Sequence, residues 1–395
     1  MALDAVAILE KLVGFDTVSA NSNLALIEWV VGYLEGYGVK STLTRDADGA
    51  KANLFATIGP GDRGGVILSG HTDVVPVAGQ AWDSDPFRLT ERDGQLFGRG
   101  TADMKGFIAL ALALAPQALS CPLQRPLHLA LSYDEEVGCL GVPALIRALP
   151  QGPARPLLAI IGEPSEMRVA NAHKGIQFLR TAVTGHEAHS SAPEHGVNAI
   201  TAAAEIIAEI GRLAAECRAA AKPESRFDPP YTSFNIGRIE GGTAVNIIAR
   251  DCAFEWEFRT IPDEDDAAPR RRIDRFVENE LLPRMRAGFP DADIVTETAA
   301  LVPPLVPDPG SPAEVLAREL TGVNETTTIA FATEAGLFQM AGIPAVICGP
   351  GSIEVAHKPN EYITRDQLAA GGAFLDGLLD RLCHDDGGVG LPRTA

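Results

Sequence analysis

Apolar residues follow two different periods along the first 173 residues of the chain. Residues 22–37 carry Ile27, Val30, Val31 and Leu34 along one face, which predicts an amphipathic helix. Short apolar runs bounded by turn residues predict strands between such helices. The other elements predicted here are helices at 3–14 and ending near residue 115, and strands at 53–58, 66–68, 127–133 and 157–161. Strands that alternate with helices indicate an α/β fold with a mostly parallel sheet.

The pattern changes between residues 174 and 299. Strands and helices there follow the order β-α-β-β-α-β, which is typical of a split-βαβ, ferredoxin-like α+β domain. The predicted strands are 174–185, 232–239, 251–259 and 294–297, and the predicted helices are 197–221 and 263–287. A chain of 395 residues is expected to form two domains. We therefore predict an α/β domain built from residues 1–173 and 300–395, with residues 174–299 inserted into it.

Acidic and imidazole side chains follow three of the predicted α/β strands. His71 and Asp73 follow the strand at 66–68, Glu135 follows the strand at 127–133, and Glu163 follows the strand at 157–161. In open α/β sheets, ligands bind at the carboxyl ends of the strands. Residues two apart on a strand point the same way, so Asp73 is placed to orient the His71 ring for a metal ion. The alternative is a loop histidine and aspartate satisfied by nearby backbone.

The candidate ligands are sufficient in number for two metal ions. Two ions that share one bridging carboxylate need about two further protein ligands each, which leaves a position for water. Asp103 as the bridge, His71 and Glu163 on one ion, and Glu136 and His357 on the other give this count.

Glu135 is left over by this count and lies beside the ligand Glu136. Adjacent residues of an extended segment face opposite ways, so the two are not expected to coordinate in the same manner. We therefore predict Glu136 as a ligand and Glu135 as the general base beside a metal-bound water.

Composition and charge narrow the class of protein. The chain has 52 acidic and 33 basic residues and a net charge of −19, which argues against binding to nucleic acid or to anionic membranes. Its most apolar stretch, residues 107–115, is too short to span a bilayer, and its first 12 residues do not resemble a signal peptide. The six cysteines show no paired spacing, so we expect reduced thiols and a cytoplasmic location.

Five segments together resemble the motif set of the dinuclear zinc aminoacylase and carboxypeptidase family, which includes succinyl-diaminopimelate desuccinylase. They are Ser69–Pro76, Gly98–Phe107, Tyr133–Gly138, Gly162–Ser165 and His357–Tyr362. The resemblance implies a zinc-binding α/β catalytic domain with an inserted dimerisation or lid domain. It also implies a homodimer with two Zn²⁺ per subunit and the same roles for the ligands, Asp73 and Glu135. Co²⁺ can substitute, because Zn²⁺, Co²⁺ and Mn²⁺ can share sites of mixed imidazole and carboxylate ligands.

Within this family, further motifs favour an amidohydrolase that removes the acetyl group from N2-acetyl-L-ornithine. These include His173-Lys174-Gly175, the segment 188–200 and Thr333-Glu334-Ala335-Gly336. The desuccinylase usually has a Ser-Asp-Gly-like sequence where this chain has Glu334-Ala335-Gly336. The alternatives are another N-acyl amino acid hydrolase, such as a desuccinylase, an acetylcitrulline deacetylase or a broad aminoacylase, and a non-catalytic metal-binding homologue.

The resemblance also suggests three lid residues that contact the small-molecule substrate, and Glu334 is a fourth candidate. The alternative roles are an exposed loop histidine for His189 and a turn residue for Asn246. His189 resembles the lid histidine that helps to hold the oxyanion, often from the partner subunit, and Asn246 and Arg259 resemble substrate contacts of the lid. Arg259 offers two parallel donors to an α-carboxylate, but a surface ion pair is its alternative role. Glu334 is a candidate contact for the substrate's side-chain ammonium, or a carboxylate that favours a helix start.

Overall fold

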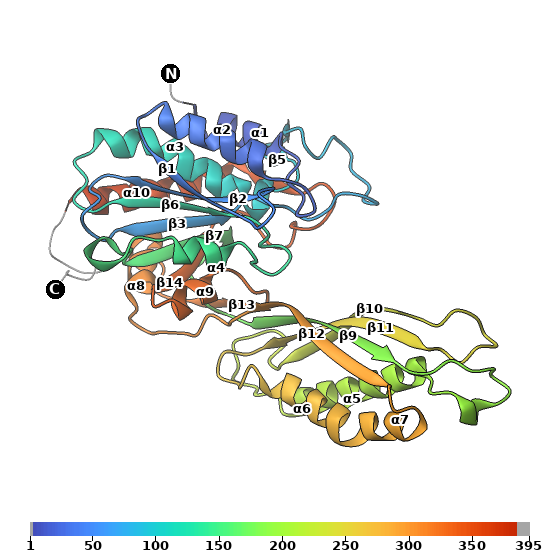
Figure 1. Cartoon of the computed structure of the whole chain (residues 1–395). Helices are drawn as coiled ribbons and strands as arrows, with labels where there is room; N and C mark the ends of the chain where they lie inside the picture. Colours follow the sequence, from blue (N-terminus) through green and yellow to red (C-terminus); the bar gives the residue numbers. More distant parts are fainter. Residues whose placement is uncertain (1–2, 385–395) are drawn as a thin grey trace. The chain divides into compact units, whose positions relative to one another are not determined.

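The computed structural model describes residues 3–384, which form two compact units (Figure 1). The larger unit contains residues up to 172 together with 305–328 and the described residues from 333 onward. The inserted unit contains residues 173–304 and 329–332.

The larger unit is built on an eight-stranded sheet of order β1-β2-β6-β3-β7-β14-β8-β13. The strands are β1 Ser41–Arg45, β2 Ala52–Ile58, β3 Val66–His71, β6 Leu127–Ser132, β7 Leu158–Pro164, β8 Ala170–His173, β13 Thr327–Ile329 and β14 Ala345–Gly349. The four strands β6, β3, β7 and β14 run parallel, whereas β1, β2 and β8 pair antiparallel with their neighbours. The predicted α/β class is confirmed, with antiparallel strands added toward the edges.

Helices cover both faces of this sheet (Figure 1). One face packs against α1 Ala5–Val13, α2 Leu24–Glu35, α3 Gly106–Ser120, α8 Pro312–Thr321 and α10 Arg365–Cys383 around a common apolar core. The other face carries α4 Val142–Arg147 and α9 Ala335–Met340. Leu68 and Ile160 point into the common core, so their strand neighbours Ser69 and Ile161 point to the α9 face. A small sheet of β4 Thr90–Arg92, β5 Gln95–Phe97 and β15 Tyr362–Thr364 completes the unit.

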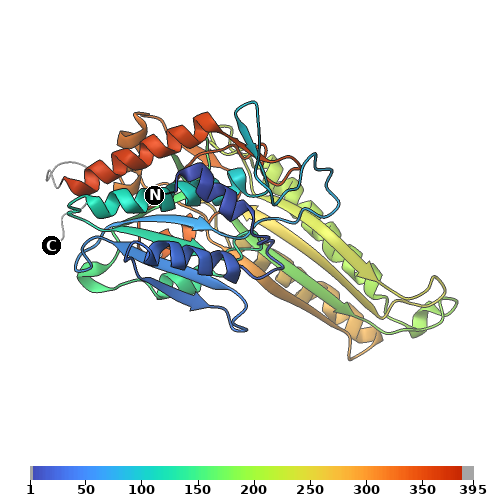
Figure 2. The same cartoon turned by 90° about the horizontal axis from the view of Figure 1, so that it is seen from above.

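α3 is the central helix of the common core and runs beside α10 (Figure 2). Within the described residues, the helical run 101–120 is long and apolar enough to cross a membrane by length and composition alone. However, 78% of its most apolar window is buried inside the protein, as expected for a core helix. Thr364 caps the start of α10, since its hydroxyl accepts a hydrogen bond from the Gln367 backbone N–H at 3.1 Å. The Gln367 side chain accepts the Gly351 N–H.

The inserted unit is a four-stranded antiparallel sheet of order β10-β11-β9-β12, with helices packed on one face. Its elements are β9 Gly175–Thr184, α5 Ala199–Ala219, β10 Ser233–Gly241, β11 Asp251–Thr260, α6 Ala268–Phe276, α7 Leu282–Gly288 and β12 Asp293–Val302. The predicted β-α-β-β-α-β order is therefore confirmed. Phe254, Trp256 and Phe258 alternate along β11 and fill the core under the helices.

One predicted helix is interrupted. Residues 263–287 were expected as a single helix, but the structure has α6, a wide helical turn at Val277–Leu281 and then α7. Pro283 has no N–H for the carbonyl of Asn279, and its ring crowds that carbonyl. A wide turn just before a proline relieves this conflict.

The cysteine prediction is wrong for one pair. Cys121, just after α3, forms a disulfide with Cys383, the last residue of α10, with a Cα–Cα distance of 6.2 Å. The two residues are 262 positions apart, so only the packing of α3 on α10 brings them together. The other four cysteines are free: Cys139, Cys217, Cys252 and Cys348.

Candidate metal centre

Several predicted ligands lie together at the edge of the sheet where the neighbouring strands β6, β3 and β7 end. His71 is the last residue of β3, Glu163 lies near the end of β7, and Glu135 and Glu136 follow β6. Gly162 allows β7 to pass close to α3, because a Cβ at this position would lie 2.0 Å from the Phe107 ring. The remaining predicted ligands, Asp103 and His357, come from segments outside these strands.

Asp103 lies between the two histidines. Its Oδ1 is 3.0 Å from His71 Nε2, and its Oδ2 is 3.1 Å from His357 Nε2. Glu136 Oε2 is 3.0 Å from the same His357 nitrogen, and Glu163 Oε1 is 3.8 Å from His71 Nε2. The structure thus places His71 and Glu163 on one side of Asp103, and His357 and Glu136 on the other.

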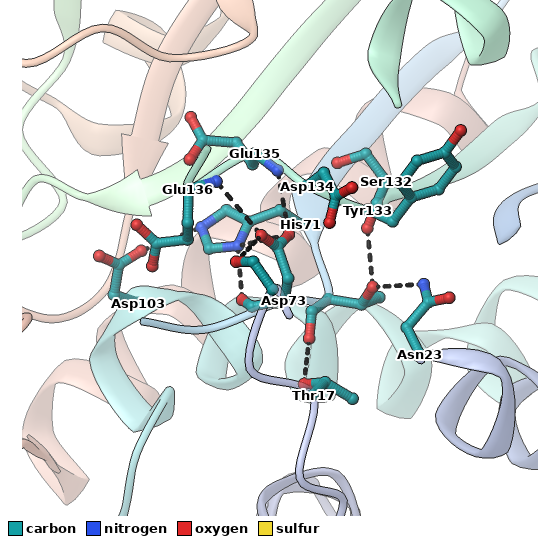
Figure 3. A network of polar contacts seen from close by, with 12 residues as sticks. Thr17, Asn23, His71, Asp73, Asp103, Ser132, Tyr133, Asp134, Glu135 and Glu136 are labelled. Carbon is teal, nitrogen blue, oxygen red and sulfur yellow. Dashed lines mark hydrogen bonds and ion pairs between the residues drawn. The ribbon is translucent and has the colours of Figure 1, made fainter. Parts of the chain in front are cut away.

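Asp73 holds this arrangement in a different way from the one predicted. The backbone carbonyl of Asp73, rather than its carboxylate, lies within hydrogen-bond distance of His71 Nδ1, at 2.9 Å, and the nearest carboxylate oxygen is 3.7 Å away. With the proton on Nδ1, Nε2 is free to bind a cation. The Asp73 carboxylate instead accepts hydrogen bonds from Ser19 Oγ and from the backbone N–H groups of Glu135 and Glu136 (Figure 3).

Both Glu135 and Glu136 can reach a cation position. Ligand atoms of His71, Glu135 and Glu163 lie within 4.8 Å of one another, and so do those of His71, Asp103 and Glu136. Glu136 lies beside Asp103, whereas Glu135 Oε1 accepts a hydrogen bond from the Cys139 thiol at 3.4 Å. Each of the two glutamates therefore belongs to a group of side chains that could hold a cation.

The cluster concentrates negative charge in a buried space. Burial and the neighbouring Asp103 raise the pKa of Glu136 to about 7, and burial also raises the pKa of Glu135 and Glu163 well above the usual range. The hydrogen bonds to Asp103 and Glu136 raise the pKa of His357 to about 10. Divalent cations would relieve this crowding by taking the place of bound protons.

The donor set fits such cations. Glu163 Oε1 is buried and has no hydrogen-bond partner among the described residues, although its oxygen faces His71. A buried carboxylate oxygen without a partner is costly, and a cation between Glu163 and His71 would satisfy it. Mixed imidazole and carboxylate ligands suit Zn²⁺ and related first-row metals.

The predicted substrate residues of the inserted unit lie in two places. His189 and Asn246 are both exposed. They are neighbours, because His189 forms an isolated antiparallel β-bridge with Ile247 and the Ser190 N–H donates to the Asn246 carbonyl at 3.1 Å. Arg259 lies near the other end of β11. Its Nε donates to Glu257 Oε1 at 3.1 Å, which is the ion pair considered as its alternative role.

Glu334 lies inside the larger unit and not on its surface. Its side chain is fully buried just before α9, and its two carboxylate oxygens accept hydrogen bonds from the hydroxyls of Ser69 and Ser132. These serines lie on β3 and β6, close to the metal ligands. Both carboxylate oxygens are thus used inside the fold, which favours the role at a helix start over contact with a substrate ammonium.

Several functional contacts were missed from the sequence. Ser19 donates to Asp73 at 2.7 Å, but a serine 54 residues away gives no local signal of this role. Glu361 accepts hydrogen bonds from the backbone of the Asp103 segment. It lies inside the segment His357–Tyr362 that carried the family resemblance, so its acidic character next to a ligand histidine was a usable signal.

This arrangement of imidazoles and carboxylates around a shared aspartate, at the carboxyl edge of a parallel sheet, defines the class as a metal-dependent hydrolase. A model of Peptidase family M20/M25/M40 matches residues 67–381. The chain belongs to this family, whose members include an enzyme described as a dinuclear metal-binding peptidase.

Known proteins resemble the chain along most of its length. An acetylornithine deacetylase from Myxococcus xanthus is 36% identical over 386 residues, which cover 95% of this chain and 97% of that protein. A metallo-carboxypeptidase of the M20 family from Sulfolobus solfataricus shares the fold with a TM-score of 0.76 at 18% identity, over 96% of this chain and 99% of that one. The dinuclear metal-binding peptidase, from Bacillus subtilis, has a TM-score of 0.61 at 16% identity, over 95% of this chain and 96% of that chain.

Proposed function

We propose that the chain is a metal-dependent amidohydrolase that converts N2-acetyl-L-ornithine to L-ornithine and acetate, a step of arginine synthesis. The observation that carries the proposal is the 36% identity to an acetylornithine deacetylase over nearly the whole of both chains. The cluster around Asp103 supports it, because every ligand needed for a two-metal hydrolase is present.

Two Zn²⁺ ions, or Co²⁺ in their place, are proposed for the centre, where they would polarise the amide carbonyl and supply a nucleophilic water. Asp103 is the proposed bridge, with His71 and Glu163 on one side and Glu136 and His357 on the other. Asp73 fixes the His71 ring through its carbonyl and the Glu135–Glu136 segment through its carboxylate.

Glu135 is proposed to act as the general base and then as the general acid. It takes a proton from the attacking water and returns it to the leaving amine, so one carboxylate serves both steps. His189 is proposed to donate a hydrogen bond to the oxyanion that forms on the amide oxygen. Arg259 and Asn246 are proposed to bind the substrate, with the Arg259 guanidinium on the α-carboxylate.

We further propose a cytoplasmic homodimer in which the inserted unit joins the subunits. Asn246 precedes the first residue of β11, Asp251, and Arg259 lies eight residues beyond Asp251. A strand rises about 3.3 Å per residue, so Arg259 is about 26 Å from the start of β11. One small acyl amino acid cannot contact both ends of this strand. Since the resemblance gives the lid histidine to the partner's site, we propose that Arg259 and the pair His189 and Asn246 act on one substrate from different subunits.

A parallel substrate assay tests the activity. The zinc-loaded protein is compared on N2-acetylornithine, succinyl-diaminopimelate, N-acetylcitrulline and N-acetylmethionine by kcat/KM. We expect acetylornithine to be preferred by about tenfold or more, a difference equivalent to about 1.4 kcal/mol. Preference for a succinyl substrate would require a cationic partner for its extra carboxylate and would overturn the assignment. Activity on none of the four would favour a non-catalytic homologue.

A further inference from the structure

We propose that Glu361 is a positioning residue that fixes the position of Asp103 relative to His357. In this position Asp103 can bind both cations while His357 binds one of them. The inference rests on the proposed metal-dependent function and adds a residue that lies outside the ligand set. It is carried by the contacts that surround the Glu361 carboxylate.

Glu361 is almost completely buried, and both of its carboxylate oxygens are fully used. Oε1 accepts the backbone N–H groups of Ala102 and Asp103 at 2.9 and 3.1 Å. Oε2 accepts the Gly100 N–H at 3.0 Å and the Arg99 guanidinium at 2.7 Å. Four donors therefore fix the segment that ends in the bridging aspartate.

The same carboxylate is joined to the backbone of His357. Arg99 donates to Gln80 Oε1 at 2.6 Å, and Gln80 Nε2 donates to the His357 carbonyl at 2.9 Å. Arg99 Nη1 also lies 3.3 Å from the Lys358 carbonyl. The chain from Glu361 through Arg99 and Gln80 thus connects the two residues that face each other across 3.1 Å at the metal centre.

Glu361 is unsuited to act as a ligand itself. Its charge is balanced by Arg99, whose side chain is 1% exposed, and its oxygens have no free acceptor position. A glutamate in this state does not compete for the cations, but it sets the position of Asp103. An amide in its place would point an NH₂ group at backbone N–H donors and leave Arg99 without a counter-charge.

The test measures cation affinity rather than activity. Dissociation constants for Zn²⁺ are measured by competition with a chromophoric chelator for the wild type and Glu361→Gln, and Co²⁺ absorption spectra report the ligand geometry. Mutation of residues that hydrogen-bond to metal ligands typically lowers the affinity for the metal by about 10–100-fold. We expect a loss of this size for both cations in Glu361→Gln, together with an altered Co²⁺ spectrum.

A second variant separates the two sides of the centre. Gln80→Leu removes the link to the His357 carbonyl and leaves the Glu361 contacts to residues 100–103 in place. We expect it to weaken one cation by about tenfold and to leave the other unchanged. This variant keeps the test decisive if Glu361→Gln fails to fold, because unchanged affinity for both cations in Gln80→Leu would overturn the proposal.

Matched controls are available in the same unit. Glu314 is also buried and paired with an arginine, Arg318, but lies on α8. Glu314→Gln and the loop change Gln124→Leu are expected to alter thermal stability at most, with wild-type cation affinity. If Glu361→Gln behaves like Glu314→Gln, its role is only structural and the inference fails. A wild type that binds two cations but does not cleave acetylornithine would overturn the proposed function and leave this inference intact.

Discussion

At the scale of single residues, Glu135 and Glu136 are chemically equal but have different neighbours. Glu136 lies 3.0 Å from His357 and beside Asp103, whereas Glu135 is held by the Cys139 thiol. The two side chains therefore belong to different parts of the centre, and replacing each of them should have a different effect.

We expect Glu135→Gln to lower kcat by about 10²–10⁴-fold, because the base that moves the proton is lost. Both cations should stay bound. Glu136→Gln should lose or weaken one of the two cations, because a carboxylate ligand becomes a neutral amide. Steady-state kinetics and the metal-to-protein ratio from elemental analysis measure both effects. Loss of metal in Glu135→Gln with full occupancy in Glu136→Gln would exchange the two assignments.

His128 makes stability depend on pH. Burial lowers the pKa of this residue to about 4, and its Nε2 has no hydrogen-bond partner among the described residues. Because the unfolded chain takes up the proton near the ordinary pKa of 6.5, stability is lost as the pH falls from 6.5 to 4. The loss is about 3 kcal/mol for this residue.

We expect His128→Gln to lose about 3 kcal/mol less than the wild type between these pH values in urea unfolding. The matched control is Thr57→Val, which removes the hydroxyl 3.0 Å from His128 Nδ1 and keeps the titrating ring. The control should retain the wild-type pH dependence, and equal slopes for all three proteins would contradict the prediction.

At the scale of secondary-structure elements, Glu334 links two strands to a helix. It lies at the start of α9 and accepts hydrogen bonds from Ser69 on β3 and Ser132 on β6. We expect Glu334→Ala to cost about 2–4 kcal/mol, because two buried hydroxyls lose their acceptor and a cavity forms. Glu334→Gln should cost less, since an amide can still bond both hydroxyls. Urea unfolding measures both. Unchanged stability with a raised KM would restore Glu334 as a substrate contact.

The elements that carry the site could be predicted because each combines two signals. β3, β6 and β7 are apolar runs that end in acidic or imidazole residues. β1 could not, since it is a short, half-exposed edge strand, and β8 has small residues whose burial depends on its neighbours in the sheet. Pro283 indicates the interruption before α7, whereas the helical pattern on both sides of it predicts one continuous helix.

The contacts of the candidate site likewise include some that could be predicted from the sequence and some that could not. The cluster of imidazoles and carboxylates around Asp103 could be predicted from residue types at strand ends and from motif resemblance. The Glu334 environment could not, because Ser69 lies 265 residues away in sequence and only the sheet brings it to the carboxylate. The role of the Asp73 carbonyl was also hidden, since a sequence shows side chains and not which backbone groups are free to accept.

At the scale of the whole molecule, the placement of His189 and Arg259 at opposite ends of β11 leads to a complementation test. We expect the homodimers of His189→Ala and of Arg259→Ala to be nearly inactive. Mixing them under conditions that exchange subunits should restore activity. In a mixed dimer, one of the two sites then has an intact Arg259 from one subunit and an intact His189 from the other.

The recovered activity per mixed dimer should approach half that of the wild type, since only one of its two sites is complete. Exchange itself is measured by mixing tagged and untagged His189→Ala subunits under the same conditions and quantifying the untagged subunits that co-purify with the tag. No recovery would mean that both residues act from the same subunit and would contradict the assignment.

The disulfide can be counted directly. Cys121 and Cys383 are paired and four cysteines are free, so the denatured protein should expose four reactive thiols before reduction and six after it. A disulfide is unusual in a reducing cytoplasm, which makes the count in freshly lysed cells informative. Six thiols before reduction would show the pair to be reduced, as the sequence had suggested.

The pairing of β9 with β12 has a consequence for folding. The chain enters the inserted unit on β9 and leaves on β12, and these strands are neighbours, with Ile176 opposite Val302. Bringing distant segments together costs chain entropy that must be met before long-range contacts form, and this slows folding. Once the inserted unit has folded, residues 172 and 305 are held close together, because they flank the paired strands β9 and β12. We therefore expect the inserted unit to fold first and to speed the assembly of the larger unit around it.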